Sequence, residues 1–199
     1  MSDRIVLDRD GLRRTLVRIA HEIIEKNPEG QHLAIVGVHT RGAVLGRRLH
    51  GLLGELTEAE IPLGDVDIAF YRDDLDRRDP NDTPVVEASH LDFDLTGRTV
   101  VLTDDVLFTG RTVRAAIDVL FDYGRPDRVQ LAVLADRGHR ELPIRPDYVG
   151  KNLPTRLGER VNVELEEIDG VDEVTIGAAR EGARSGSGPA AHSEEEGGS

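Results

Sequence analysis

Residues Val100–Thr112, with the sequence VVLTDDVLFTGRT, decide the fold of this chain. An apolar, β-branched run ends in two adjacent carboxylates, Asp104 and Asp105, and a short polar loop follows. From Val113 to Leu120 the apolar residues then recur with the period of a helix. The pattern predicts a buried strand, an acidic pair at its exposed carboxyl end, a tight loop and the N-terminus of a helix.

The loop between this strand and this helix has the chemistry of a phosphate-binding site. Free N–H groups at a helix N-terminus attract an anion, and the hydroxyls of Thr109 and Thr112 add donors. Gly110 lets the backbone approach a phosphate without an intervening Cβ. Asp104 and Asp105 can accept hydrogen bonds from two vicinal hydroxyls. The segment therefore predicts a site for a 5-phosphoribose, and no G-x-x-x-x-G-K-[ST] loop occurs in the chain.

The segment resembles the motif that binds phosphoribosyl pyrophosphate (PRPP) in type I phosphoribosyltransferases. The resemblance implies an α/β fold, in which helices flank a central, mostly parallel sheet that carries a small hood. The PRPP-binding residues that it implies are Thr40, Arg41, Asp104, Asp105, Val106, Leu107, Phe108, Thr109, Gly110, Arg111 and Thr112. Asp104, Asp105 and Arg41 are then the expected catalytic residues, and Mg2+ is expected at the two aspartates through PRPP. Purine-specific members usually carry an acid where Phe108 stands, so this chain lacks the general base for a purine.

Strands and helices alternate along the rest of the chain, which indicates a parallel sheet. The further expected elements are the helices Leu12–Glu25 and Ala43–Leu56 and the strands Leu33–Val38, Val66–Tyr71, Val129–Leu134, Arg160–Ile168 and Glu173–Ile176. We expect residues 1–176 to form one phosphoribosyltransferase-like domain. Residues 177–199 are rich in Gly, Ser and Glu, and we expect them to form a disordered acidic tail.

Polar segments follow three of the predicted strands, at residues 39–42, 104–112 and 135–139. Ligands of parallel sheets bind at the carboxyl ends of the strands, so the three segments predict one shared site. The first of them can wrap an oxyanion, and in type I phosphoribosyltransferases this loop holds the pyrophosphate of PRPP.

A long charged stretch, residues 73–90, contains two Pro and shows no periodicity. Loops of this length in compact domains are uncommon and often functional, and here we expect a lid that keeps water from the reaction. The lid arginines are Arg72, Arg77 and Arg78.

The segment 135–155, ADRGHRELPIRPDYVGKNLPT, narrows the resemblance. Together with YRDDL at 71–75 and TGRTVRA at 109–115, it closely resembles the bifunctional pyrimidine-operon regulators that are also uracil phosphoribosyltransferases, over about residues 4–176. The partners implied are PRPP, uracil, UMP and a pyr mRNA leader element. The resemblance further implies a homo-oligomer, a dimer or larger. The absence of Cys fits a cytoplasmic protein. We expect Arg137 and the strand around Val161 to frame the base, largely through backbone groups.

The RNA contacts implied by this resemblance are Arg14, Arg18 and His21 on the first helix and His139, Arg140, Arg145 and Lys151 after the fourth strand. Of these, we expect Arg140 and Lys151 in the loop after that strand, away from the phosphate-binding loop. The net charge of −13 argues against indiscriminate nucleic-acid binding. However, residues 157–199 hold eleven acidic residues against three Arg, so a basic face on the core remains possible. Unpaired loop bases would supply sequence specificity.

Three classes of function remain open from the sequence. The first is the bifunctional regulator, and the second is a uracil salvage phosphoribosyltransferase without an RNA-binding role. Val17, where such regulators often carry a small polar residue, and the acidic balance keep the second class open. The third is a regulator that binds nucleotides without turnover, and the intact acidic pair argues against it. Whether control acts by transcription attenuation or on translation stays open.

Composition excludes other chemistry. The chain has no Cys, which excludes disulfides, Cys-ligated zinc and a thiol nucleophile. Its seven His show no recognisable metal-ligand spacing, and no apolar run reaches the length of a membrane span, so no membrane partner is expected.

Overall fold

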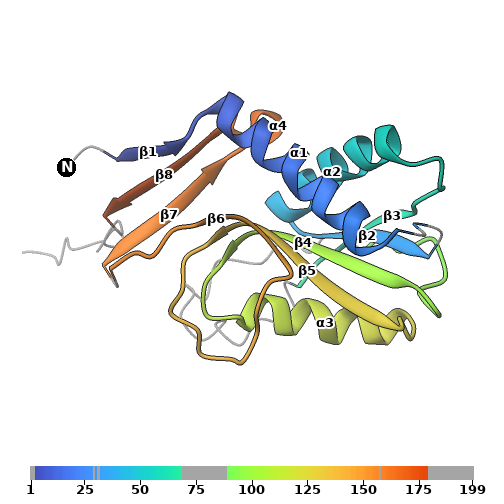
Figure 1. The fold of residues 1–199 in the computed structure, drawn as a ribbon. Coiled ribbons are helices and arrows are strands. Elements are labelled where there is room, and N and C mark those ends of the chain that lie inside the picture. Colours follow the sequence, from blue (N-terminus) through green and yellow to red (C-terminus); the bar gives the residue numbers. More distant parts are fainter. Residues whose placement is uncertain (1–2, 29, 31, 69–88, 157, 179–199) are drawn as a thin grey trace, which may run out of the picture.

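The computed structural model describes residues 3–28, 30, 32–68, 89–156 and 158–178. Its elements are β1 (Arg4–Leu7), α1 (Arg9–Lys26), β2 (Leu33–Val38), α2 (Arg41–Leu56), β3 (Leu63–Val66), β4 (Thr99–Leu107), α3 (Arg111–Tyr123), β5 (Arg128–Asp136), β6 (Tyr148–Asn152), β7 (Glu159–Glu164), α4 (Glu166–Asp169) and β8 (Glu173–Ala178). Five strands form a parallel sheet in the order β3-β2-β4-β5-β6. Three others form an antiparallel sheet in the order β1-β8-β7, which is the hood. The expected α/β architecture is confirmed (Figure 1).

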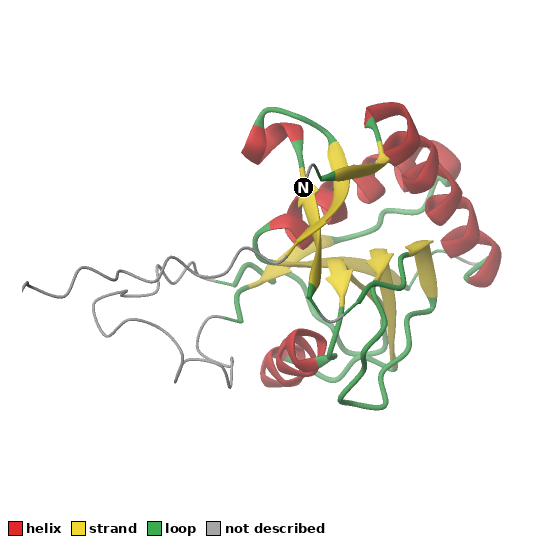
Figure 2. Cartoon of the chain, turned by 90° about the vertical axis from the view of Figure 1, so that its left-hand side faces the viewer, coloured by secondary structure: helices red, strands yellow, loops and turns green. Residues whose placement is uncertain are grey.

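The parallel sheet is covered on both faces, by α1 and α2 on one side and by α3 on the other (Figures 1 and 2). Successive side chains of a strand point to opposite faces, so each central strand contributes to two cores. Ile35 of β2 and Val101 of β4 belong to the core that contains α1, α2 and the hood strands. Val36 and Leu102 belong to the core under α3. Burial on both faces explains why these strands read as continuous apolar runs.

Helix α2 lies unusually close to the sheet. A Cβ added to Gly37 of β2 would lie 2.3 Å from the Cα of Ala43, and one added to Gly42 would lie 2.4 Å from the carbonyl oxygen of Thr103. Both distances are too short for non-bonded atoms, so these positions need glycine. The close contact brings the loop after β2 against the end of β4.

Several boundaries differ from those expected. The start of the strand predicted at Val66–Tyr71 is wrong, because β3 begins at Leu63 and ends at Val66, where its pairing with β2 ends, and residues 67 and 68 are not in a strand. Residues 69–71 of that prediction lie outside the described residues. The strand predicted to reach Ile168 stops at Glu164, and α4 follows it. Strand β8 runs to Ala178, beyond the expected end at Ile176. The lid arginines Arg72, Arg77 and Arg78, most of the expected lid and the expected tail from 179 onward lie outside the described residues.

In the part of the chain that the structure describes, each helix is too short or too polar to span a membrane.

Arg48 of α2 forms one of the contacts between α2 and the segment that joins β7 to β8 in the hood. Its guanidinium donates to both carboxylate oxygens of Glu167, at 2.9 and 2.5 Å, and to those of Asp172, at 2.7 and 3.1 Å. The hydrogen bond from Arg48 lowers the pKa of Glu167. Burial opposes the ionisation of Asp172, but the hydrogen bonds from Arg48 and from the Glu166 amide together lower its pKa. Both carboxylates are therefore stabilised in the charged form.

We predict that Arg48→Met lowers the free energy of unfolding by about 2 kcal/mol, as expected for the removal of hydrogen bonds to charged groups. Carboxyl groups with lowered pKa values stabilise the fold above their ordinary pKa of about 4 and lose that contribution as the pH falls through their folded-state values. The difference between wild type and variant should therefore narrow as the pH falls below about 4. Urea unfolding at several pH values measures it. The exposed neighbour Arg47 supplies the control, Arg47→Met, and equal losses in both variants would contradict the prediction.

Candidate functional site

The acidic pair lies at the carboxyl end of β4. The Oδ1 atom of Asp104 accepts a hydrogen bond of 2.9 Å from the amide of Asp105, and Oδ1 of Asp105 accepts one of 2.7 Å from the amide of Val106. The expectation that both carboxylates are exposed is wrong for Asp104, which is only 7% exposed, whereas Asp105 is half-buried. Within a regular strand adjacent side chains point to opposite faces, so Asp105 is the more accessible of the two to a ligand.

The predicted phosphate loop, Leu107–Thr112, follows β4 and turns into α3 at Gly110, which has a left-handed φ of 94°. A side chain would be strained at this φ, and its Cβ would also lie 3.3 Å from Ile144 and 3.4 Å from Leu142. Thr109 accepts a 3.3 Å hydrogen bond from the amide of Arg111 through Oγ1. The N–H groups in the first turn of α3 have no partners within the helix, as an anion site requires.

Arg140 holds this loop in place. Its Nη1 donates to the carbonyl oxygen of Phe108 at 2.9 Å, and its Nε donates to that of Ile144 at 3.0 Å. Its Nη2 forms an ion pair with Asp136, at the end of β5, at 2.6 Å. The expectation that Arg140 lies away from the phosphate loop is therefore wrong. The guanidinium joins two loops because it offers five donors in a rigid plane.

Backbone groups strengthen the same contact. The amides of Glu141 and Leu142 both donate to the carbonyl oxygen of Thr109, at 3.0 and 3.1 Å. The carboxylate of Glu141 also pairs with Arg111 at 2.8 Å, on the exposed side. The segment 138–144 thus covers the phosphate loop, and sequence reasoning did not assign Glu141 to the site. Opposite charges in two separate segments were the only signal for that pair.

Arg137 stacks on Phe108, with its guanidinium carbon 3.9 Å from the ring centroid. It also donates to Oγ1 of Thr155 at 2.9 Å and to the carbonyl oxygen of Glu159 at 2.5 Å. Burial lowers the pKa of Arg137, and the nearby charge of Arg160 lowers it further. The stack forms a planar, cationic surface beside the phosphate loop, where a flat base can pack.

The other predicted base-binding residue, Val161, is buried in the core on β7, paired with Ile176. Its side chain therefore lies in the core, and any contact with a base would come from its backbone. His139 also contacts Phe108, edge-on, with the ring centroids 5.9 Å apart.

The loop after β2 carries Thr40 and Arg41. The peptide bond between His39 and Thr40 is cis. Arg41 begins α2, and its guanidinium donates to both oxygens of Asp169 in the hood, at 2.8 and 3.1 Å. Its Nε is buried and lacks a hydrogen-bond partner among the described residues. Arg41 therefore forms an ion pair with the hood, a contact that the sequence did not indicate. Its buried Nε is left as a hydrogen-bond donor.

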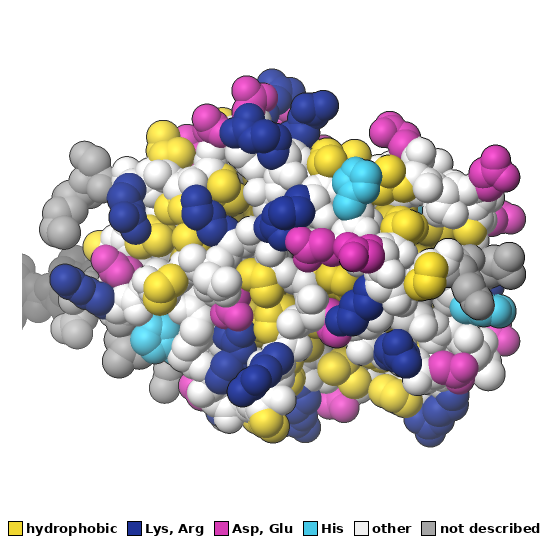
Figure 3. Space-filling view, viewed as in Figure 1, with side chains coloured by type: hydrophobic (Ala, Val, Ile, Leu, Met, Phe, Trp, Pro, Cys, Tyr) yellow, Lys and Arg dark blue, Asp and Glu magenta, His cyan; other side chains and the backbone are white. Residues whose placement is uncertain are grey.

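The predicted RNA-binding residues lie on α1, on β6 and in the segment after β5. Arg14 and His21 are exposed on α1, as are His139 and Arg145 after β5. Arg18 reaches across to the carbonyl oxygens of Val149 and Gly150, at 3.0 and 2.6 Å, and so binds α1 to β6. Lys151 lies on β6 and not in the expected loop, and it donates to Val6 at 3.2 Å. Figure 3 shows Lys and Arg side chains spread over this face of the molecule.

Comparison with known proteins agrees with this geometry. The model of the family described as "Phosphoribosyl transferase domain" matches residues 6–165. The chain is 52% identical to the bifunctional protein PyrR of Halalkalibacterium halodurans over 173 residues, which cover 87% of this chain and 96% of that protein. It is 57% identical to the bifunctional protein PyrR of Deinococcus radiodurans over 171 residues, covering 86% and 92%.

Solved structures resemble the fold. A hypoxanthine phosphoribosyltransferase from Staphylococcus aureus matches with a TM-score of 0.64 at 16% identity, covering 86% of this chain and 90% of that one. The hypoxanthine phosphoribosyltransferase of Trypanosoma cruzi matches with a TM-score of 0.66 at 16% identity, covering 88% and 96%. The chain therefore belongs to the phosphoribosyltransferase family and, within it, to the group of bifunctional PyrR proteins.

We predict that Arg140→Met loosens the phosphate loop without unfolding the chain. Loss of the charge-assisted hydrogen bond to Phe108 should speed amide hydrogen exchange in residues 107–112 about tenfold or more, which corresponds to roughly 1.5 kcal/mol of local stability. Hydrogen–deuterium exchange followed by mass spectrometry measures this rate. The control is Arg145→Met, which removes an exposed cation from the same segment. Unchanged exchange in the Arg140 variant would show that the backbone contacts of Thr109 suffice.

Proposed function

We propose that this protein is a pyrimidine-nucleotide-responsive, RNA-binding regulator of pyrimidine biosynthesis genes that also converts uracil and PRPP to UMP and diphosphate. The observation that carries the proposal is the loop Leu107–Thr112, which is turned by Gly110 and held by Arg140 beside the half-buried carboxylate of Asp105. The relatives named as bifunctional PyrR proteins support the pairing of an enzyme with a regulator.

Each part of PRPP has a matching group. The backbone amides of residues 107–112 would bind the 5′-phosphate, and Asp105, supported by Asp104, would accept hydrogen bonds from the ribose hydroxyls. The buried Nε of Arg41 and the amides beside Thr40 would bind the pyrophosphate. In this role Arg41 must share its guanidinium with Asp169 or leave it. The lid arginines would complete the pyrophosphate site.

The carboxylates of Asp104 and Asp105 also fit Mg2+, which prefers oxygen ligands and needs few from the protein. In each of them one of the two carboxylate oxygens, Oδ1, accepts a hydrogen bond from the next amide. Bound with PRPP, the ion would offset the negative charge that builds up on the leaving pyrophosphate.

In the proposed reaction, N1 of uracil forms a bond to C1 of the ribose while the bond from C1 to the pyrophosphate oxygen breaks. Positive charge develops on the ribose, and the fixed carboxylate of Asp105 stabilises it. The N1 proton is acidic enough to pass to the departing diphosphate without a strong base, which agrees with Phe108 at the position where purine-specific enzymes carry an acid. Phe108 and Arg137 would instead pack against the pyrimidine ring.

The RNA-binding role rests on the basic face formed by α1 and β6. Arg14, His21 and Lys151 are exposed there, and Arg18 joins the two elements. Such residues would contact phosphates, and unpaired bases would supply specificity. The proposed partner is a pyr mRNA leader element, which places the activity in the cytoplasm. We keep the prediction of a homo-oligomer as part of this proposal.

A uracil salvage enzyme without an RNA-binding role is the second candidate. One observation favours it: Arg18 and Arg140, two of the cations predicted to bind RNA, make contacts within the chain. Their charges are partly compensated before any RNA binds. The exposed cations Arg14, Arg145 and Lys151 then decide between the two candidates.

Turnover tests the enzyme half of the proposal. With PRPP and Mg2+, uracil should be converted to UMP, while hypoxanthine and guanine should not react. Asp105→Asn should lower uracil turnover about 100-fold, roughly 3 kcal/mol, which is typical for the loss of one group that stabilises transition-state charge. Asp118→Asn, on the exposed face of α3, is the matched control and should keep wild-type turnover. Efficient use of purines, or full turnover in Asp105→Asn, would refute the assignment.

Filter binding with a pyr leader RNA tests the regulatory half. The double variant Arg14→Gln, Lys151→Gln should bind RNA more weakly at low salt. The slope of log K against log salt concentration should become less steep by roughly 0.7 to 0.9 for each RNA phosphate that the variant no longer neutralises. UMP should tighten the wild-type complex, because a sensor must bind RNA better with its nucleotide. Uracil turnover should not change. Arg114→Gln on α3, on the opposite face of the sheet, serves as control. If the wild type shows no detectable RNA binding, the uracil salvage enzyme without an RNA-binding role is the candidate that remains.

A further inference from the structure

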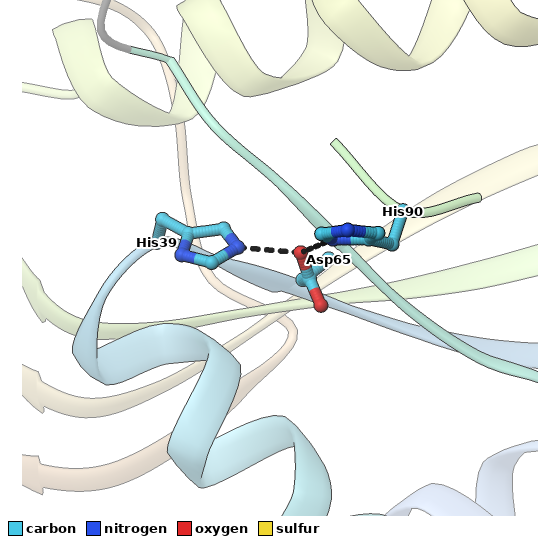
Figure 4. Close-up of side chains that lie close together, drawn as sticks. All are labelled: His39, Asp65 and His90. Atoms are coloured by element: carbon cyan, nitrogen blue, oxygen red, sulfur yellow. Dashed lines mark hydrogen bonds and ion pairs between the residues drawn. The ribbon is translucent and has the colours of Figure 1, made fainter. Parts of the chain in front are cut away.

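Three side chains from separate parts of the chain converge beside the loop after β2. Nε2 of His39 lies 2.5 Å from Oδ1 of Asp65, and Nδ1 of His90 lies 3.1 Å from the same oxygen. The three ligand atoms all lie within 4.8 Å of one another. Figure 4 shows the two imidazole rings on either side of the carboxylate, with both nitrogens directed at it. None of the three groups has a role in the proposed reaction.

We propose that His39, Asp65 and His90 form a binding site for a divalent transition-metal ion, of which Zn2+ fits best. Two imidazole nitrogens and one carboxylate oxygen are a common set of three zinc ligands, and water occupies the fourth position of such sites. Mg2+ and Ca2+ are disfavoured because both prefer oxygen ligands.

The distances suit this ion after small side-chain movements. Zinc–ligand bonds of about 2.0–2.1 Å in a tetrahedron place neighbouring ligand atoms roughly 3.3 Å apart. The present separations of 2.5 and 3.1 Å from the carboxylate oxygen therefore need to open by less than 1 Å, and the two nitrogens, which lie within 4.8 Å of each other, need to approach by at most about 1.5 Å. The side chain of His90 is 62% exposed and has room to move, whereas those of His39 and Asp65 are 15% and 20% exposed. The exposed side of His90 leaves the fourth position open to water.

The backbone holds the three residues in fixed positions. Asp65 and His90 exchange two backbone hydrogen bonds, of 3.0 and 2.9 Å. The amide of His39 donates to the carbonyl oxygen of Val66 at 2.9 Å, and Asp65 lies within β3, paired with Gly37 of β2. A site built on paired strands is better preorganised than one built on free loops, so little backbone rearrangement accompanies binding.

His39 directly precedes Thr40 and Arg41, the residues predicted to bind pyrophosphate. An ion bound at this site would fix the imidazole of His39 and thereby the start of that loop. The site is nevertheless separate from Asp104 and Asp105, the predicted Mg2+ ligands, and its occupancy does not depend on the proposed reaction.

Metal binding is measured on the full chain in the absence of PRPP and Mg2+. Equilibrium dialysis against Zn2+ alone should give one ion per chain. Co2+ alone should develop the visible absorption of a four-coordinate site. His90→Gln changes an exposed side chain and should lower the affinity by more than tenfold, because the loss of an outer-shell partner alone costs at least that much. Asp65→Asn should have the same effect, with folding checked by circular dichroism.

His32→Gln is the matched control, since His32 is exposed and lies outside the cluster. It should bind one ion with wild-type affinity. The proposal is overturned if the wild type binds no stoichiometric ion, or if His90→Gln and His32→Gln bind equally well. Metal binding is measured without substrates, so a failure of uracil turnover would not change this result. The two proposals are therefore tested separately.

Discussion

The guanidinium of Arg140 connects the two loops on which the site depends. It joins Phe108, in the loop after β4, to Asp136 and Ile144, which lie at and beyond the end of β5. A phosphate-binding loop needs fixed amides, but glycine at its turn gives the backbone freedom that opposes this order. The contact from Arg140, together with the two hydrogen bonds that backbone amides donate to Thr109, fixes the loop from outside. The geometry of the site is thus set by a neighbouring segment.

The central architecture was predictable because its causes are local. The apolar runs Leu33–Val38 and Val129–Leu134 are buried on both faces of the sheet, and the structure places strands over both runs. β1 and β6 were not predicted. β1 is short and mostly exposed, and β6 has one fully buried residue, Tyr148, beside Gly150, Lys151 and Asn152. Such edge strands form because they pair with the neighbouring strand of the sheet, and their composition alone does not predict them.

The candidate site divides in the same way. The acidic pair and the loop at Gly110 form one continuous stretch, so sequence reasoning found them. The ion pair of Arg41 with Asp169, 128 residues away, and the cluster of His39, Asp65 and His90 depend on tertiary contacts. Spacings of 25 and 26 residues match no local motif, which is why the seven His gave no metal signal. The acidic residues of the hood were likewise visible in the sequence, but the sequence did not indicate that Arg41 and Arg48 of α2 pair with them.

The proposed enzyme site and the proposed RNA-binding face are joined by contacts within the chain, which would let one respond to a ligand at the other. Asp136 accepts from Arg140 through its side chain and from the amide of Leu153, at 2.7 Å, through its carbonyl oxygen. Leu153 directly follows β6, whose carbonyls at 149 and 150 hold Arg18 of α1. Contacts therefore run without a break from the phosphate loop to the basic face. A nucleotide that orders the loop would stabilise one arrangement of that face, and by linkage RNA bound there would favour the nucleotide equally. Neutralising Arg140 would then impair both roles together, because it acts on the segment that they have in common.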